Sequence, residues 1–212
     1  MMNRKILILL TIAIFTIIAI IGINCETGVE DSPLPGIIRV KLQADLSDTI
    51  LVERSDTFTV NIKYPAVFMI KIFQGRIFEK QSFAVLYRTK SSYRQEDALY
   101  NILELDSTGK YKEYVIFESY IPPGNYDKIE FGVNASRDDK LKIIALSGKK
   151  FENSVNLPPG EKLLVEFPQD FKISENRVTQ INIQISPLKS IKRYKDVYHF
   201  YRQMKITDVY YF

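Results

Sequence analysis

The sequence has one cysteine, one histidine and no tryptophan among its 212 residues. An intrachain disulfide needs two cysteines, so the folded part must draw its stability from a hydrophobic core. Metal sites and nucleophilic triads need histidine, cysteine or clustered carboxylates, which are scarce here. The formal net charge of +4 is also too small to indicate a nucleic-acid partner. We therefore predict a non-enzymatic protein with no cofactor and no metal.

Long helical periodicity is missing after the first two dozen residues, and aromatic and β-branched residues are abundant instead. The chain contains thirteen Tyr and thirteen Phe, residue types that fit pleated sheets. Residues 37–42, 58–62 and 178–185 alternate in the two-residue period of a half-buried strand. The more continuous run at residues 67–73 predicts a central strand. Further segments with strand character are residues 83–87, 115–117, 140–145 and 205–210, and residues 97–103 form either a helical turn or a short strand.

About ten short strands separated by turn signals predict an all-β fold, an antiparallel β-sandwich. Two segments, residues 121–124 and 157–160, share the pattern hydrophobic–Pro–Pro–Gly followed four residues later by a β-branched residue, Glu and Phe. Each pattern predicts a type II turn with Gly124 or Gly160 at positive φ. A glycine-rich phosphate loop is the disfavoured alternative, because it needs a glycine array that opens a helix, and neither is present.

The first 25 residues predict the compartment. Arg4 and Lys5 precede an almost unbroken apolar run at residues 6–23, and Cys25 follows it. Such a run is helical if it enters a bilayer, and it is just long enough to span one. The two cations stay on the cytoplasmic side, so the rest of the chain is exported.

Three interpretations of this segment differ at Cys25. The pattern resembles a bacterial lipoprotein signal peptide, in which the cysteine becomes the lipidated first residue of the mature chain. The alternatives are an uncleaved helical anchor and ordinary secretion. The first interpretation divides the chain into a signal peptide (residues 1–24), a tether (residues 25–36) and a β-sandwich domain (residues 37–212). Palmitate-type acyl chains on Cys25 would hold the protein at a membrane.

Two stretches interleave cations with aromatic residues. Stacking rings beside cations suit sugars, anionic polymers or lipid head groups. Alternating strand faces give the same pattern without a ligand, because the aromatic residues then pack and the cations are solvated. The candidate ligand-binding residues are Tyr87, Arg88, Tyr93, Arg94, Lys192, Arg193, Tyr194, Tyr198 and Tyr201.

The remaining candidates for catalysis or metal binding are isolated residues or pairs of residues. His199 stands between two aromatic residues in a strand pattern, which favours a partly exposed strand histidine over a catalytic base. The pairs at residues 96–97 and 138–139 are acidic, so they are either calcium ligands or solvated turn residues. No nucleophile-elbow motif accompanies His199.

From about residue 99 to the end, the sequence resembles the bacterial lipoprotein family known as domain of unknown function four-three-eight-two. The residues that carry the resemblance are segments 101–105, 121–129, 157–160, 179–191 and 198–206. Where the family's late strand ends in an aspartate, this chain has Ser186. The resemblance implies an exported β-sandwich of immunoglobulin-like or prealbumin-like type, and it carries no catalytic residues.

These observations give three functional hypotheses. The first is a lipid-anchored protein of the bacterial cell envelope, at the outer membrane or cell surface, whose β-sandwich serves binding, adhesion or assembly with an envelope partner. The second is a module that recognises a glycan or another anionic polymer. The third is a hydrolase that uses His199.

Overall fold

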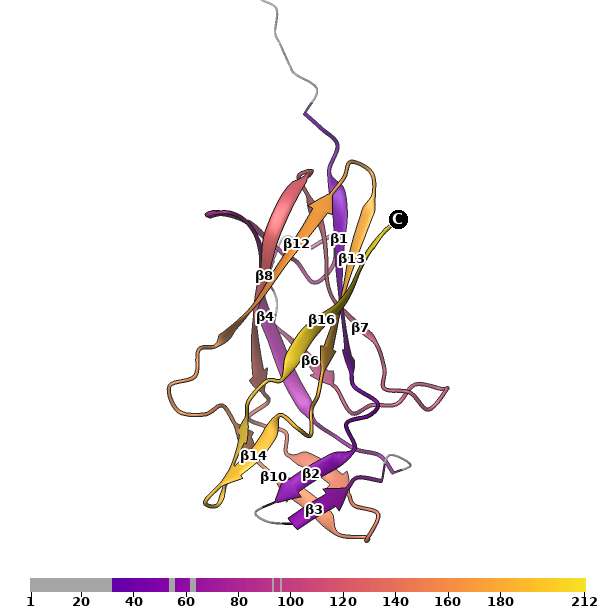
Figure 1. Cartoon of the computed structure of the whole chain (residues 1–212), viewed down its shortest axis with the longest axis vertical. Helices are drawn as coiled ribbons and strands as arrows, with labels where there is room; N and C mark the ends of the chain where they lie inside the picture. The colour runs from indigo at the N-terminus through magenta and orange to yellow at the C-terminus, as the bar shows by residue number, and fades with distance from the viewer. Residues whose placement is uncertain (1–31, 54–55, 62–63, 93, 96) are drawn as a thin grey trace, which may run out of the picture. The chain divides into compact units, whose positions relative to one another are not determined.

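The computed structural model describes residues 32–53, 56–61, 64–92, 94–95 and 97–212, and Pro33–Phe212 forms one compact unit. Every regular element in this described part is a β-strand (Figure 1). The all-β prediction is therefore confirmed. The predicted signal peptide, Cys25 with most of its tether, Tyr93 and Glu96 lie outside the described residues.

The first large sheet has the strand order β16-β13-β1-β7. Side chains of β1 alternate between buried and half-buried along its whole length, so the two-residue period predicted this strand correctly. Ile38, Val40 and Leu42 are fully buried on its inner face. The strands of this sheet are β1 (Gly36–Ala44), β7 (Tyr114–Ile121), β13 (Val178–Ile185) and β16 (Met204–Tyr211).

One pairing in this sheet contradicts the prediction of purely antiparallel strands. β1 and β13 run parallel in continuous register, from Ile37 opposite Val178 to Ala44 opposite Ile185. Parallel neighbours need a long crossover connection, which in many proteins is a helix. Here the crossover contains the whole second sheet, so the absence of strand–helix alternation did not exclude a parallel pair. β11 (Val155–Asn156) and β15 (Val197–Phe200) are also parallel.

The second large sheet has the order β12-β8-β4-β5, with β6 also pairing with β4, and all its pairings are antiparallel. The predicted central position of residues 67–73 is confirmed, although the strand begins at Met69. The segment at residues 97–103 forms a strand and not a helical turn. The strands are β4 (Met69–Glu79), β5 (Ser82–Val85), β6 (Ala98–Asn101), β8 (Gly124–Ala135) and β12 (Leu164–Ile173).

The two Pro–Pro–Gly segments fold differently. Gly160 has φ of +79°, and the Glu161 amide donates to the Pro158 carbonyl at 3.2 Å, which agrees with the predicted turn. Gly124 does not have positive φ and is already the first residue of β8, so that turn prediction is wrong. The reason is that β7 and β8 belong to different sheets, and the prolines span the step between them.

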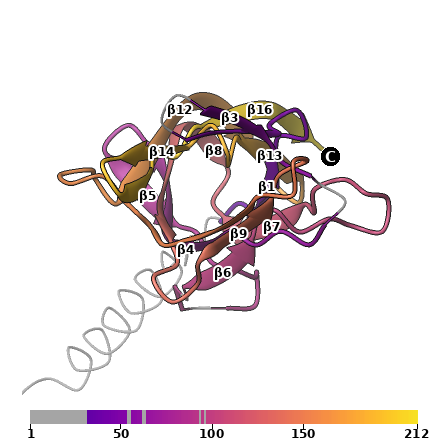
Figure 2. The same ribbon diagram turned by 90° about the horizontal axis from the view of Figure 1, so that it is seen from below.

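Figure 2 shows the strands of the two large sheets standing around a common centre. Both sheets contribute side chains to one hydrophobic core. Phe131 of β8 is fully buried, and its ring contacts residues of both sheets. Its ring centroid is 5.7 Å from that of Phe117 in β7 and 5.1 Å from that of Phe167 in β12. Aromatic pairs at these distances stabilise beyond the area they bury.

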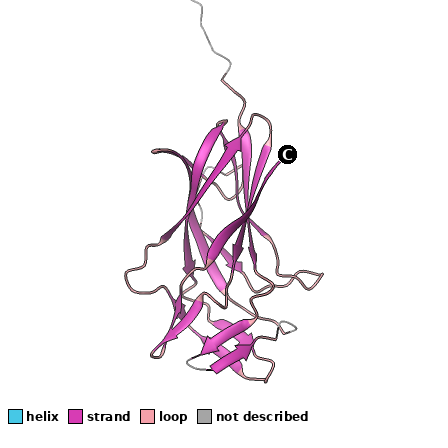
Figure 3. Cartoon of the chain, in the orientation of Figure 1, coloured by secondary structure: helices cyan, strands magenta, loops and turns pink. Residues whose placement is uncertain are grey.

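Three smaller sheets gather beyond the ends of the large ones. In Figures 1 and 3, β1 begins at one end of the described unit, whereas β2, β3, β10 and β14 lie at the other. We call the latter the distal end. Its short strands are β2 (Ile50–Glu53), β3 (Asp56–Thr59), β9 (Leu141–Ile144), β10 (Lys150–Asn153) and β14 (Ile191–Tyr194), besides β11 and β15.

Candidate functional site

The later basic-aromatic stretch forms the hairpin of β14 and β15 at the distal end. Ile191 pairs with Phe200 at its base, and both are buried. Lys195 turns the chain with φ of +55°. Tyr198, His199 and Phe200 of β15 are all buried, whereas Lys192 and Tyr194 of β14 are exposed, so some aromatic and basic residues of the hairpin are packed and others face solvent.

Two of the candidate residues anchor the hairpin. The Tyr198 hydroxyl, buried in the structure, donates to Oε1 of Glu53, and Arg193 donates to the same oxygen at 2.8 Å. Arg193 also donates to Asp196 at 2.7 Å, and Lys149 donates to the other oxygen of Glu53 at 2.6 Å. Arg193 is therefore engaged by carboxylates of the protein itself.

The ionisation of this cluster follows from its contacts. The hydrogen bond from Lys149, together with that from Tyr198, holds the pKa of the Glu53 carboxyl below its usual value. Burial and the hydrogen bond to Glu53 raise the pKa of the Tyr198 phenol to about 12. Both directions favour an ionised carboxylate bound by a neutral phenol at neutral pH. The Glu53 cluster thus joins β2, β14 and β15 through charge.

The other three candidates of this stretch are solvent-accessible. The Lys192 ammonium lies 5.1 Å from the ring centre of Tyr201, and the Lys195 ammonium lies 5.7 Å from that of Tyr194. Tyr194 is 66% exposed and Tyr201 is 42% exposed. Each of these tyrosine rings therefore forms a solvent-accessible cation–π contact with its lysine.

A groove of about 610 Å³ lies between β2 and β14. Ile50 and Val52 occupy one side of β2 and are 44% and 51% exposed, whereas Leu51 between them is fully buried. The buried Leu188 and Ile191 also line the groove, and the side chains of Lys189, Lys192, Arg193 and Gln203 add polar groups to the lining.

A buried carboxylate fixes one wall of this groove. Asp48 is fully buried and accepts hydrogen bonds from the backbone amides of Leu188 at 2.7 Å and Lys189 at 3.2 Å. Burial raises the pKa of the Asp48 carboxyl against the opposing effect of these hydrogen bonds. The Ser190 hydroxyl donates to the Ser186 carbonyl at 2.6 Å, which closes the same turn.

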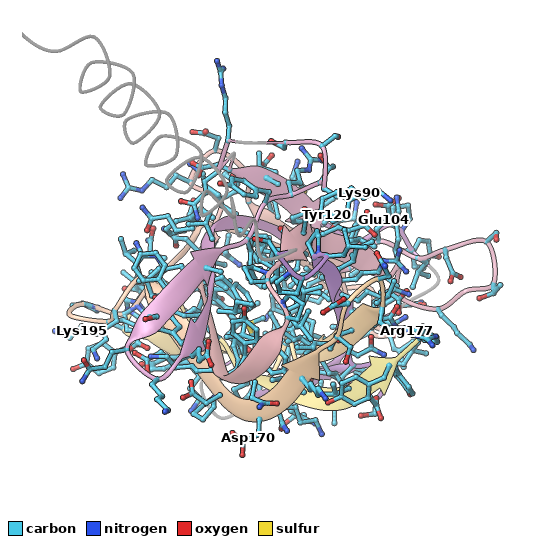
Figure 4. The ribbon with its side chains drawn as sticks, turned by 90° about the horizontal axis from the view of Figure 1, so that it is seen from above. Lys90, Glu104, Tyr120, Asp170, Arg177 and Lys195 are labelled. Atoms are coloured by element: carbon cyan, nitrogen blue, oxygen red, sulfur yellow. The ribbon has the colours of Figure 1, made fainter. Side chains whose placement is uncertain are left out.

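The earlier basic-aromatic stretch lies elsewhere. The Ser119 hydroxyl accepts the Tyr87 amide at 2.6 Å, so this stretch runs beside β7. Arg88 lines a depression of about 510 Å³ that also contains Arg39, Lys41 and Glu118, and Arg39 pairs with Glu118 at 2.7 Å. Arg94 is exposed, and Tyr93 lies outside the described residues. In Figure 4, Lys90 of this stretch and Lys195 of the hairpin lie on different sides.

Sequence reasoning missed four residues of the distal end: Asp48, Ile50, Val52 and Glu53. The short run at residues 50–53 contains three apolar residues in succession, so it has no alternation that would assign a face. Only the folded structure shows that Ile50 and Val52 remain exposed and share the groove with three cations, Lys189, Lys192 and Arg193.

The isolated chemical candidates show no assembled catalytic or metal centre in the described residues. His199 is 9% exposed, more buried than we predicted, and its Nδ1 has no hydrogen-bond partner among them. Asp139 accepts a hydrogen bond from Ser136 at 2.8 Å, and Asp97 pairs with Lys71. Across the described ranges, no three His, Cys, Asp or Glu side chains cluster to hold a metal.

Comparisons with protein-family models, curated proteins and solved structures found no match to this chain. In the part of the chain that the structure describes, no helix has the length and apolar character needed to cross a membrane.

Proposed function

We propose that this chain is an exported protein of the bacterial cell envelope, held at a membrane through lipidated Cys25, and that its β-domain binds a partner without catalysis. The charged start, the apolar run and the single cysteine directly after it support the export and the anchor. The outer membrane or the cell surface is the location we propose.

The observation that carries this proposal is the position of the groove relative to the start of β1. The tether leads into Gly36 at one end of the unit, and the groove between β2 and β14 lies at the distal end (Figure 1). An anchor ahead of β1 would leave that end accessible to a partner in the surrounding space. Exposed Ile50 and Val52, which line the groove together with Lys189 and Lys192, give a surface that favours binding.

We also propose that the two large sheets form a β-sandwich of immunoglobulin-like or prealbumin-like type and that the chain is related to the lipoprotein family named above. Support for the first statement is the shared core of both sheets. Support for the second is the set of sequence segments that carry the resemblance.

Intact-mass spectrometry of the protein extracted from its native membrane tests the anchor. The expected mass is that of residues 25–212 plus a diacylglycerol and one further acyl chain. Cys25→Ser should abolish both the acylation and the cleavage. A native protein that keeps residues 1–24, or that is cleaved without added lipid, would overturn the lipoprotein interpretation.

A second candidate function is recognition of a glycan or another anionic polymer. The exposed rings of Tyr194 and Tyr201, each beside a lysine, favour it. A glycan array probed with the full chain tests this function. Tyr194→Ala and Tyr201→Ala should each reduce binding several-fold, whereas Tyr120→Ala at the opposite end should not, although Tyr120 is 53% exposed. Equal binding by all three variants argues against it.

A further inference from the structure

We propose that the groove between β2 and β14 binds a detached, single-chain anionic amphiphile, such as a long-chain fatty acid. Its aliphatic chain would lie along Ile50 and Val52, and its acidic head would meet the ammonium of Lys192. The inference rests on the proposed function, since it names the ligand class of the same surface.

The apolar part of the lining argues for an aliphatic ligand. Ile50, Val52, Leu188 and Ile191 are all aliphatic, and none of the described lining residues is aromatic. Sugar rings bind most often by stacking on aromatic faces, which this groove does not offer. A volume of about 610 Å³ falls in the range of small-molecule sites. The groove therefore suits a flexible hydrocarbon chain better than a glycan.

The exposed β-branched side chains strengthen this argument. Val52 is 51% exposed on the solvent side of a four-residue strand, a position that polar residues usually take. Hydrocarbon that covered Ile50 and Val52 would remove their apolar surface from water, at roughly 25 cal/mol for each Å². Burial of this apolar surface would thus favour binding.

The positive charges that line the groove favour an anionic ligand. Arg193 is already bound by Glu53 and Asp196, whereas no described carboxylate forms an ion pair with Lys189 or Lys192. Asp48 lies close enough to Lys189 to interact with its charge, so Lys192 is the cation most available to an incoming anion. An acidic head group complements this end of the groove.

The groove is preformed. The turn at Leu188 is fixed by Asp48, and β14 is fixed through Arg193 and Glu53. A wall held in place by internal hydrogen bonds loses little conformational entropy when a ligand binds. The ligand can then gain affinity from the contacts without ordering the site.

The position of the groove favours a detached amphiphile over a lipid in the bilayer. It lies at the distal end, opposite the start of β1 (Figure 1). A lipid in a bilayer could bind only if the groove touched that bilayer, whereas a monomeric fatty acid reaches the groove through water.

Photolabelling of the full chain in neutral phosphatidylcholine nanodiscs tests the proposal. The probe is a long-chain fatty acid with a diazirine in its alkyl chain, and mass spectrometry maps the labelled peptides. We expect label on the peptides that contain Ile50, Val52 or Leu188. Lys192→Glu should reduce that label about tenfold, a change that corresponds to one contact of moderate strength. Lys195→Glu, three residues further on and outside the groove, should change it less than about twofold.

Three comparisons decide the outcome. Val52→Asp should remove the label, and Val197→Asp, on the exposed side of β15, should not. An equally long diazirine alcohol should label the groove about tenfold less, because it lacks the charge. Equal labelling by the alcohol, or unchanged labelling of Lys192→Glu and Val52→Asp, would overturn the proposal. Labelling of the groove by a diazirine phospholipid in the bilayer would overturn the claim that the ligand is detached from the membrane. If Cys25 proves unmodified while the groove is labelled, the anchor fails and this inference survives.

Discussion

The two large sheets and the distal end are stabilised by different interactions. In the large sheets, strands of eight to twelve residues enclose stacked aromatic rings around Phe131. At the distal end, strands of two to four residues are joined by two carboxylates: the buried Asp48, which binds backbone amides, and the half-buried Glu53, which binds side chains. Strands this short form few ladder hydrogen bonds and bury little apolar surface, so they depend on polar anchors.

The comparison indicates that the large sheets provide most of the stability, whereas the distal end provides the candidate binding groove. The large sheets hold the fold through apolar burial, which does not depend on pH. The distal end depends on charges, and it is there that exposed apolar groups and lysines form the groove. Substitutions in the two regions should therefore differ in size and in pH dependence.

Phe131→Ala should have the largest effect on global stability. The side chain is fully buried between two aromatic partners, so its removal leaves a cavity and should lower the free energy of unfolding by about 3–5 kcal/mol. Urea denaturation measures the loss. Val115→Ala, on the 41% exposed Val115 of β7, is the control and should cost under about 0.5 kcal/mol. A loss below about 1 kcal/mol for Phe131→Ala would show that the packing of this ring contributes little to the stability of the core.

Asp48→Ala should have the next largest effect. It removes the acceptor of the buried Leu188 amide and of the part-buried Lys189 amide, and a buried group left unsatisfied costs roughly 1–3 kcal/mol. The free energy of unfolding should fall by about 2–3 kcal/mol, and hydrogen exchange at these two amides should accelerate. Asp48→Asn keeps one acceptor oxygen and should cost less. If Asp48→Ala instead stabilised the protein, relief of the buried charge would outweigh the lost hydrogen bonds.

Glu53→Gln should weaken the distal end in a pH-dependent way. The variant loses charge-assisted bonds to Lys149 and Arg193 and should cost about 1–2 kcal/mol at neutral pH. Because the pKa of Glu53 is lowered in the folded state, its contribution is present above its unfolded value of 4.5 and disappears as pH falls through the folded value.

Hydrogen exchange at the β14 and β15 amides, followed from pH 7 to pH 3, measures this dependence. The difference between the wild type and Glu53→Gln should shrink as the pH falls. Glu166→Gln is the matched control, because Glu166 forms an exposed ion pair with Lys128 at 3.6 Å, which is worth little. A difference that stays constant across this range would mean that packing, and not charge, holds the hairpin.

Sequence reasoning predicted the large sheets better than the distal end. β1 buries alternate residues over its whole length and β13 does so from Ile181 onward, so local periodicity was sufficient to find them. Their parallel pairing was missed, because pairing depends on residues about 140 positions apart, such as Ile37 and Val178. Periodicity carries no information about which strands become neighbours.

At the candidate site, sequence reasoning found the hairpin but not its partners. Tyr198 and Arg193 were candidates for a ligand surface, with internal packing as the alternative, and both bind Glu53, which is about 140 residues earlier in the chain. A cation or an aromatic residue on a strand has the same sequence signature whether its partner is internal or external. Ile50 and Val52 were missed for a related reason, since their exposure is set by β14 and the Leu188 turn.

The smallest predicted effect compares the two Pro–Pro–Gly segments directly. Gly160→Ala should cost about 1 kcal/mol, because a side chain at φ of +79° is strained even though no atom lies within 4 Å of the added Cβ. Gly124→Ala should be neutral or stabilising by up to about 1 kcal/mol, because the residue is extended and its added Cβ would meet the Tyr126 ring at an ordinary 3.5 Å. Thermal unfolding of both variants measures the difference. Equal losses would mean that the shared sequence imposes the same turn at both places, and that the sheet-to-sheet step at Gly124 does not override it.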